Sequence, residues 1–322
     1  MKIIQKPELR NVSGYNNAIE CATDILTKCD GIISVYQFGG IQSPGISDID
    51  LFAVFEDNVK CERNIIKTLP TEFQYYWTHG IAGLSYSFYQ KNSSYTLWHN
   101  YKTLWGENIS SEQTISEQEL IVLKQQIALE FLLKNYIDLN VQKTYGTLKL
   151  RPTLQALKGL VYDFEFLGIT SGEVHQYFSD LRRYINEWFS QEWYEDKTSE
   201  WFLDFLSYYE KVLPGLFSDK EIFIPFKEKY MFSKNIEIKN AKDLKFTHHG
   251  ISLPVNLFLD QKKFYNLHHR LNNFKFYFPI TNKPHSPILN DRYNFMLNMK
   301  KYNSQYLPNF MSQTSSFLSN LF

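Results

Sequence analysis

The first seventy residues alternate between helical and extended hydrophobic patterns. Apolar side chains recur every three or four residues over residues 14–28, which predicts a helix. Two β-rich apolar runs follow, at residues 32–38 and 48–55, and a loop of glycine, serine and proline separates them. Residues 60–69 have the pattern of a short helix. Helices and strands that alternate in this way predict an α/β unit built on a small sheet.

An aromatic segment at residues 73–105 continues this unit. Its composition favours β-structure, and the run Gly83–Tyr89 is expected to form a strand. Gly106 is expected to end the segment.

A helical period dominates the next hundred residues. Two sequences have the spacing of a capping box, Thr114-x-x-Glu117 and Thr170-x-x-Glu173, and an apolar stripe follows each. Pro214 is expected to end the last helix. The predicted helices cover residues 120–136, 151–168, 174–188 and 197–213. Four helices in succession indicate a helical domain.

From about residue 220 the pattern weakens into short β-like runs between stretches rich in lysine and asparagine. The segment SQTSSFLSNL near the end of the chain is expected to be frayed. We therefore expect an α+β protein of three parts: a mixed sheet with helices at residues 1–112, a helical domain at 113–218, and a basic, aromatic-rich region at 219–322.

Charge is unevenly distributed along the chain, although its formal net value is zero. Residues 1–219 hold 19 Lys/Arg and 28 Asp/Glu, whereas residues 220–322 hold 15 and 6. This excludes a uniformly basic coat for nucleic acid. The basic part either docks against the acidic helices, which is the interpretation that we favour, or binds RNA through the lysines and aromatic side chains that it interleaves. The acidic residues at 173–219 would alternatively attract a cationic acceptor.

The sequence also indicates a cellular setting. Its three cysteines form neither a disulfide framework nor a C-x-x-C metal site. Charged residues interrupt the N-terminal segment, which therefore lacks the apolar run of a signal peptide. No window approaches the ~18 uninterrupted apolar residues of a membrane span. We expect a cytoplasmic protein that does not enter a membrane.

The segment from Phe38 to Leu51 carries the chemistry. Asp48 and Asp50 stand two apart in an extended run, so both carboxylates project from one face, ~6.6 Å apart along the chain. Ile49 and Leu51 point to the opposite face and are expected to be buried. Two carboxylates on one rigid face suit Mg²⁺, which usually keeps waters and substrate phosphates as its remaining ligands.

Two glycines and a serine precede these aspartates. Gly39 and Gly40 follow a predicted strand and lack the Cβ that would keep a phosphate from the backbone. Ser47 is expected either to orient Asp48 or to donate to a phosphate oxygen. An isolated Asp-x-Asp is often no more than the exposed start of a strand, so the strand, the Gly-Gly pair and the spacer are what give this motif its meaning.

This stretch resembles the DNA polymerase β-like nucleotidyltransferase superfamily, whose pattern is a hydrophobic residue, Gly-Gly or Gly-Ser, a short spacer and Asp-x-Asp between hydrophobic residues. Leu104-Trp105-Gly106-Glu107 is similar to a segment of the antibiotic nucleotidyltransferases, which also carry a helical domain. The resemblance implies a nucleotidyltransferase fold at residues 1–112. It further implies that Gly39, Gly40 and Ser47 contact the triphosphate of an NTP such as ATP, and that Asp48 and Asp50 hold Mg²⁺.

The third carboxylate that is usual in this superfamily has no counterpart in the expected place. Between Glu72 and Glu107 the chain has no Asp or Glu, and the expected strand offers Ser85 and Ser87 instead. Candidates elsewhere, among which the sequence cannot choose, are Glu107, Glu130, Asp163 and Glu165. Two further expectations rest on position: Arg151 and Lys158, seven apart on one helix face, supply charge to the triphosphate, and His79 and His99 reach the nucleotide cleft.

Three functions stay open. The first is an Mg²⁺-dependent transferase that moves an NMP from an NTP to a hydroxyl of a small molecule, RNA or protein. The second is a catalytically degenerate nucleotide-binding or interaction protein of the same fold, which the missing carboxylate would suit. The third is a toxin–antitoxin nucleotidyltransferase that acts on tRNA.

Overall fold

The computed structural model describes residues 1–97, 101–110, 114–191, 194–218, 220–226, 229–254, 261–312 and 317, with the backbone alone at 261 and 262. The chain divides into two compact units. The sheet unit comprises Glu8–Leu123 and Asn290–Thr314, and the helical unit comprises Met1–Pro7, Lys124–Leu289 and Ser315–Phe322. The units cut across the three parts expected from the sequence, because residues 220–289 lie with the helices and residues 290–314 lie with the sheet.

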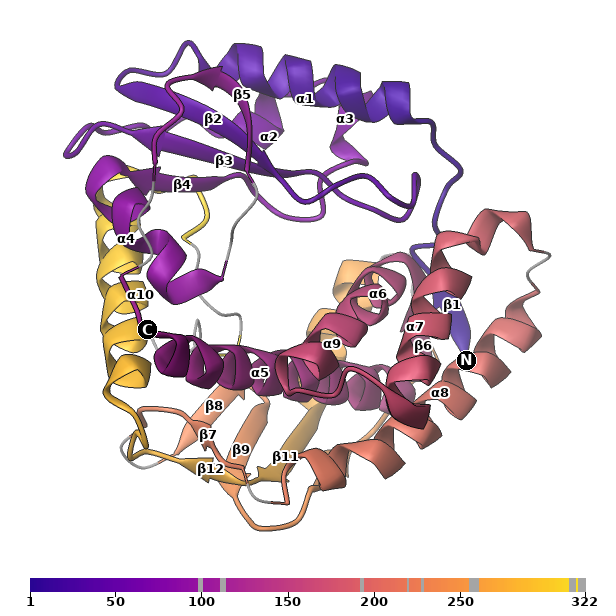
Figure 1. The fold of residues 1–322 in the computed structure, drawn as a ribbon. Helices are drawn as coiled ribbons and strands as arrows, with labels where there is room; N and C mark the ends of the chain where they lie inside the picture. The colour runs from indigo at the N-terminus through magenta and orange to yellow at the C-terminus, as the bar shows by residue number, and fades with distance from the viewer. Residues whose placement is uncertain are drawn as a thin grey trace. The chain divides into compact units, whose positions relative to one another are not determined.

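The sheet unit is built on a mixed sheet of strand order β4-β3-β2-β5 (Figure 1). Its strands are β2 (Ile32–Phe38), β3 (Asp50–Phe55), β4 (Ala82–Ser85) and β5 (Lys102–Gly106). Strand β2 pairs antiparallel with β3 and β5, whereas β3 pairs parallel with β4. The helices of this unit are α1 (Val12–Leu26), α2 (Ile65–Thr68), α3 (Thr71–Gln74) and α4 (Tyr86–Thr96).

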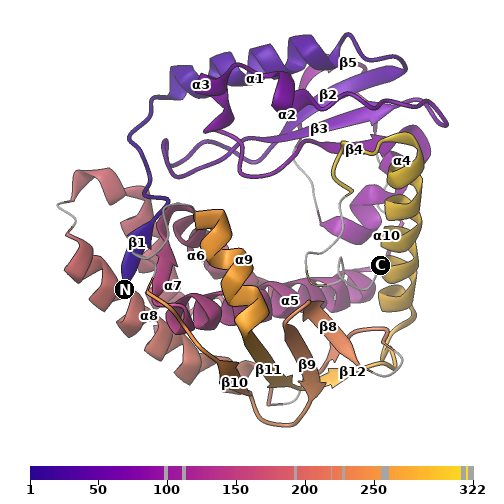
Figure 2. The same cartoon turned by 180° about the vertical axis from the view of Figure 1, so that it is seen from behind.

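Helices cover both faces of this sheet (Figures 1 and 2). Helix α1 lies over one face, where its buried Tyr15, Ala18 and Ala22 share a core with residues of β2 and β3 such as Val35 and Ala53. On the opposite face Tyr36 of β2 and Phe52 of β3 pack against Tyr89 of α4, with ring centroids 5.5 and 6.0 Å apart. The alternation of side chains along the strands thus gives the sheet two buried faces.

The segment Asn290–Thr314 completes the sheet unit from far along the chain. Helix α10 (Pro287–Tyr306) enters this unit at Asn290 and runs beside α4, where Phe295 stacks on Tyr95 at 4.7 Å. Beyond the helix, the Met311 backbone accepts from Gly83 N at 3.0 Å and donates to Ile81 O at 2.9 Å. These bonds satisfy part of the outer edge of β4, which the sheet itself leaves unpaired.

The helical unit combines long helices with small sheets. Helix α5 (Glu117–Thr144) enters this unit at Lys124. The other helices are α6 (Leu150–Phe166), α7 (Gly172–Asn186), α8 (Glu195–Leu216) and α9 (Gln261–Leu271), with a 3₁₀ turn at Trp188–Ser190. A four-stranded sheet has the order β10-β11-β9-β8, and β1 pairs with β6 and β12 with β7. These strands are β1 (Lys2–Ile4), β6 (Thr147–Lys149), β7 (Ile222–Phe223), β8 (Tyr230–Ser233), β9 (Ile236–Asn240), β10 (Lys245–Gly250), β11 (Asn272–Phe278) and β12 (Ile280–Thr281).

Aromatic packing forms the core of the helical unit. Tyr136 of α5 lies 5.9 Å from Phe276 and 6.0 Å from Phe278, so α5 covers the four-stranded sheet. Phe164 of α6 stacks on Phe178 of α7 at 4.2 Å. None of the helices in the described part of the chain has both the length and the apolar character that crossing a bilayer requires.

The α+β class expected from the sequence is confirmed, and strand β2 has its predicted bounds. The strand predicted at Gly83–Tyr89 is wrong beyond Ser85, because the chain turns into α4 at Tyr86. Pro214 does not end the last predicted helix, since α8 continues to Leu216. Most of the segment expected to be frayed lies outside the described residues.

Both predicted capping boxes are wrong in detail. The box before α5 lies two residues later than expected: Ser116 N donates to Glu119 Oε2 at 2.8 Å, and Glu119 N donates to Ser116 Oγ at 3.3 Å. Helix α7 begins after Ser171, which makes no side-chain capping bond. The S/T-x-x-E spacing occurs twice before α5, and only the copy next to the first helical turn can reach its backbone.

Candidate functional site

The loop after β2 is anchored to α1. Gly45 N donates to the hydroxyl of Tyr15 at 2.9 Å, and that hydroxyl donates to Ser47 O at 2.7 Å. Ser47 is buried, and its Oγ accepts from Ser43 N at 3.1 Å. The Ser47 hydroxyl therefore braces the turn that leads into Asp48, which fits the orienting role expected for it more closely than contact with a phosphate.

Asp48 and Asp50 lie on the same side of the extended chain at the start of β3. Ile49 and Leu51 alternate with the two aspartates along the chain. They are 1% and 3% exposed and belong to the core beneath α1. The side chains of Asp48 and Asp50 keep 22% and 31% of their surface exposed. The predicted alternation is thus confirmed: the apolar residues anchor the strand, and the two carboxylates face the other way.

A histidine joins the two carboxylates. His79 Nε2 lies 2.8 Å from Asp50 Oδ1 and 3.4 Å from Asp48 Oδ2. One ligand atom from each of the three residues can be chosen so that all lie within 4.8 Å of one another. His79 reaches this place because it lies three residues before the start of β4, whose parallel pairing with β3 begins with Ala82 opposite Phe52.

Neighbouring groups fix the orientation of the cluster. The Thr78 hydroxyl donates to Asp48 Oδ2, and His79 Nδ1 lies 2.8 Å from the carbonyl oxygen of Gly80. The hydrogen bond to Asp50 raises the pKa of His79 to about 9, with the Gly80 bond and the charges of both aspartates in support and burial opposing it. With no metal bound, the imidazole is therefore positively charged at neutral pH and bridges the two carboxylates.

The two glycines lie next to the carboxylates. Gly39 has a positive φ of 69°, and a Cβ placed on it would lie 3.8 Å from Asp50 Oδ2. A Cβ placed on Gly40 would have no atom within 4 Å. The backbone at Gly40 thus has open space beside it, and its neighbour Gly39 lies next to Asp50, as the approach of a phosphate requires.

The other predicted site residues lie mainly in the helical unit. Arg151 and Lys158 are both on α6, where Arg151 is buried and its backbone N–H donates to Gln5 O at 3.0 Å. Their contact with a triphosphate stays a prediction. His99 lies outside the described residues.

The four candidate acids do not form part of the three-residue cluster. Glu107 is in the sheet unit with an exposed side chain. In the helical unit, buried Glu130 accepts from Gln126 Nε2 at 2.7 Å, and Glu165 pairs with His175 at 3.2 Å. Burial raises the pKa of Asp163 well above its ordinary value. A role for any of them as the third acid stays a prediction.

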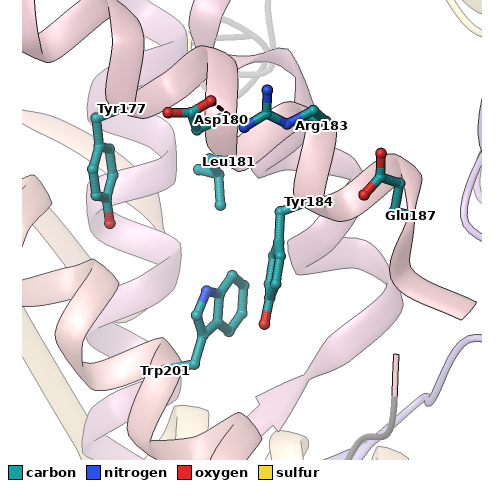
Figure 3. Close-up of a pocket in the computed structure, with 7 residues that line it drawn as sticks. All are labelled: Tyr177, Asp180, Leu181, Arg183, Tyr184, Glu187 and Trp201. Carbon is teal, nitrogen blue, oxygen red and sulfur yellow. Dashed lines mark hydrogen bonds and ion pairs between the residues drawn. The ribbon is translucent and has the colours of Figure 1, made fainter. Parts of the chain in front are cut away.

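A separate pocket of about 640 Å³ lies between α7 and α8 of the helical unit (Figure 3). Its walls include Tyr184 and Trp201, whose ring centroids are 6.2 Å apart. Asp180 at its rim is paired with Arg183 at 2.6 Å, whereas Glu187 adds a further carboxylate. Aromatic walls beside a carboxylate suit an organic cation, which agrees with the acidic character of this part of the sequence.

The role of His79 beside the aspartates is more specific than the sequence indicated. Its position before the aromatic run suggested only that it could reach a nucleotide cleft, because strand pairing between residues thirty apart cannot be read from spacing.

Comparison of the chain with protein-family models, with curated proteins and with solved structures found no match.

Proposed function

We propose that the protein is a metal-dependent nucleotidyltransferase that moves an NMP from an NTP to an acceptor hydroxyl, and that its sheet unit has the nucleotidyltransferase fold. One observation carries the proposal: Asp48 and Asp50 converge at the start of strand β3, beside Gly39 and the open backbone of Gly40. That is the arrangement through which two carboxylates and a glycine turn bind a metal–triphosphate complex.

The donor set fits a divalent cation. Two partly exposed carboxylates and an imidazole present ligand atoms within 4.8 Å of one another, which is compact enough to share one ion. When bound, the cation would neutralise charge on the triphosphate and on the pyrophosphate that leaves. Asp48 and Asp50 would hold it, and Thr78 and the Ser47 turn would keep Asp48 in position.

The reaction follows from where the phosphates would lie. Backbone N–H groups of Gly39 and Gly40 would donate to phosphate oxygens, because glycine has no side chain of its own to keep them from the backbone. The acceptor oxygen attacks the α-phosphorus and forms a new P–O bond as the bond to the bridging oxygen of pyrophosphate breaks. The hydroxyl proton passes to a base or to water. The acceptor is a small molecule, RNA or protein, and the protein acts in the cytoplasm.

Transfer of label from α-³²P-NTP tests the proposal. The protein is incubated with each of the four NTPs, Mg²⁺ or Mn²⁺, and total RNA, protein or small-molecule extract. We expect labelled acceptor and released pyrophosphate, and a loss of at least 100-fold with Asp48→Asn or Asp50→Asn. Asp57→Asn is the matched control, because Asp57 lies just after the same strand and its carboxylate accepts from the backbone N–H and the hydroxyl of Ser87. Transfer that survives in both active-site variants would exclude the proposal.

One observation favours the non-catalytic alternative. Within the described residues, the cluster that could hold a metal contains two carboxylates and a histidine rather than three carboxylates. A protein that binds NTP with these groups intact, yet releases no pyrophosphate with any acceptor, would be a nucleotide-binding protein of the same fold. Label found in tRNA would instead indicate the toxin–antitoxin activity.

A further inference from the structure

We propose that His79 is the third metal ligand beside Asp48 and Asp50, and that this set of one nitrogen and two oxygens selects Mn²⁺ over Mg²⁺. The inference rests on the proposed function for the ion's role in phosphate chemistry. The binding of the ion can be measured without any transfer reaction.

The ring orientation of His79 is the first argument. Its Nδ1 lies 2.8 Å from the carbonyl oxygen of Gly80, a contact in which Nδ1 can only donate. The nitrogen that faces the two carboxylates is therefore Nε2. A metal-binding histidine usually has this arrangement, with one ring nitrogen donating to a backbone carbonyl and the other directed at the ion.

Charge is the second argument. Nε2 stands 2.8 Å from one carboxylate oxygen and 3.4 Å from another, and neither oxygen can donate a hydrogen bond when ionised. With no metal bound, the Nε2 proton lies between the two carboxylates, and a divalent cation would take the place of that proton. A divalent ion satisfies all three groups together, because each supplies it with one lone pair.

The spacing is the third argument. Two ligands at right angles about an ion with bonds of ~2.1 Å lie ~3 Å apart, and the contacts of Nε2 fall on either side of that value. Binding would thus require small movements of three side chains that retain 22–34% of their surface exposed. The remaining coordination positions would be left for water and phosphate oxygens.

The nature of the donors decides between ions. Mg²⁺ prefers oxygen ligands and gives up its waters reluctantly, whereas imidazole suits transition ions. Mn²⁺ accepts both carboxylate oxygen and imidazole nitrogen. A third carboxylate would have given an all-oxygen site without this preference. The absence of acidic residues between Glu72 and Glu107 therefore favours Mn²⁺ over Mg²⁺.

Metal binding to the full chain without nucleotide tests the inference. By calorimetry and Mn²⁺ EPR, we expect Mn²⁺ to bind at least tenfold more tightly than Mg²⁺. His79→Ala is expected to weaken Mn²⁺ binding at least tenfold and to change Mg²⁺ binding less than threefold. His79→Asp, which gives an all-oxygen set, should abolish the preference. His175→Ala is the control. His175 lies in the helical unit and pairs with one carboxylate, that of Glu165, rather than with two.

Two results would overturn the inference. If His79 serves only as a positive counter-ion, its removal leaves two unpaired carboxylates, and His79→Ala would then bind both ions more tightly. Electron spin-echo envelope modulation of the Mn²⁺-loaded wild type reports directly bound ¹⁴N, so it does not depend on whether a variant folds. Absence of this signal would exclude His79 as a ligand.

The outcomes distinguish this inference from the proposed function. Nitrogen-bound Mn²⁺ without nucleotidyl transfer would retain the metal site and exclude the transferase. Transfer that is equal with Mg²⁺ and Mn²⁺, without a nitrogen signal, would retain the transferase and exclude the role of His79.

Discussion

The side-chain amide of Asn303 donates to the carbonyl oxygen of Gly83 at 2.9 Å. Asn303 lies on α10 and is 4% exposed, and Gly83 lies in the middle of β4. A single buried contact thus joins residues 220 positions apart and fixes α10 to the strand that follows His79.

Removing this contact should destabilise the sheet unit. We expect Asn303→Ala to lower the free energy of unfolding by about 1–3 kcal/mol, because the Gly83 carbonyl loses its partner in a buried place. Urea titration measures the loss, and hydrogen exchange should locate it at β3 and β4. Gln305→Ala, at an exposed position of the same helix, is the control and should change stability by less than about 0.5 kcal/mol.

Two glycines of the sheet unit should respond differently to the same substitution. Gly106→Ala should cost more than about 2 kcal/mol, because its φ of 83° is unfavourable for alanine and the new Cβ would lie 2.1 Å from Ile33 O. Gly40→Ala meets no atom within 4 Å and should leave stability within about 0.5 kcal/mol of wild type.

Gly40→Ala should affect nucleotide binding strongly, although its effect on stability is small. If phosphates approach the backbone at Gly40, Gly40→Ala should weaken NTP binding at least tenfold in a stably folded protein. Gly159→Ala is the matched control, since its Cβ also meets nothing within 4 Å but lies on α6. A Gly40→Ala protein that binds NTP as wild type does would place the phosphates elsewhere.

Thr78 should act through Asp48. Its hydroxyl donates to Asp48 Oδ2, and the residue is exposed. Thr78→Val should therefore reduce Mn²⁺ affinity about tenfold, as loss of a group that orients a ligand usually does, with stability nearly unchanged. Calorimetric titration measures the affinity, and Thr78→Ser, which keeps the hydroxyl, should restore it. Equal binding by the valine and serine variants would show that Asp48 needs no such support.

Asp163 should make stability depend on pH. Its pKa is ordinarily about 3.8, and burial raises it in the folded protein. Above pH 3.8 the unfolded chain releases this proton while the folded chain retains it, so rising pH favours unfolding. Asp163→Asn should therefore raise Tm at pH 7 to 8 and leave it nearly unchanged below pH 3.8.

Scanning calorimetry across this range tests the sign of the effect. Glu200→Gln is the control, because Glu200 is an exposed carboxylate on α8 of the same unit. An Asp163→Asn protein that is less stable at neutral pH would mean that ionised Asp163 has a favourable partner. Loss of nucleotidyl transfer in the same variant would support Asp163 as the missing acid.

Local sequence patterns correctly predicted the elements whose structure depends on residues close together in the sequence. Strand β2 has the predicted limits, and Ile49 and Leu51 are buried because alternation in a strand leaves them only one face to occupy. Tyr86 to Tyr89 has a strand-like composition but lies in a helix. Here Tyr89 packs against Tyr36 and Phe52, and this tertiary packing outweighs β-propensity.

The residues of the candidate site also differ in how far the sequence alone could group them. Asp48, Asp50 and the glycines are neighbours in sequence, so their spacing was sufficient to place them together. His79 joins them only through the parallel pairing of β3 with β4, and spacing alone carries no information about that pairing. Thr78 was missed for the same reason, although two consecutive polar residues directly before an apolar run are a signal worth noting.

The division of the sheet unit between residues 8–123 and 290–314 has a consequence for synthesis of the protein. A ribosome completes β2, β3 and β4 long before it adds α10 and Met311, which cover α4 and the outer edge of β4. During translation that edge and the apolar surface beneath α10 stay open to other chains. Strand β4, which follows His79, obtains these partners only after residues 124–289 have been synthesised, so the proposed metal site would be completed later than β2 and β3.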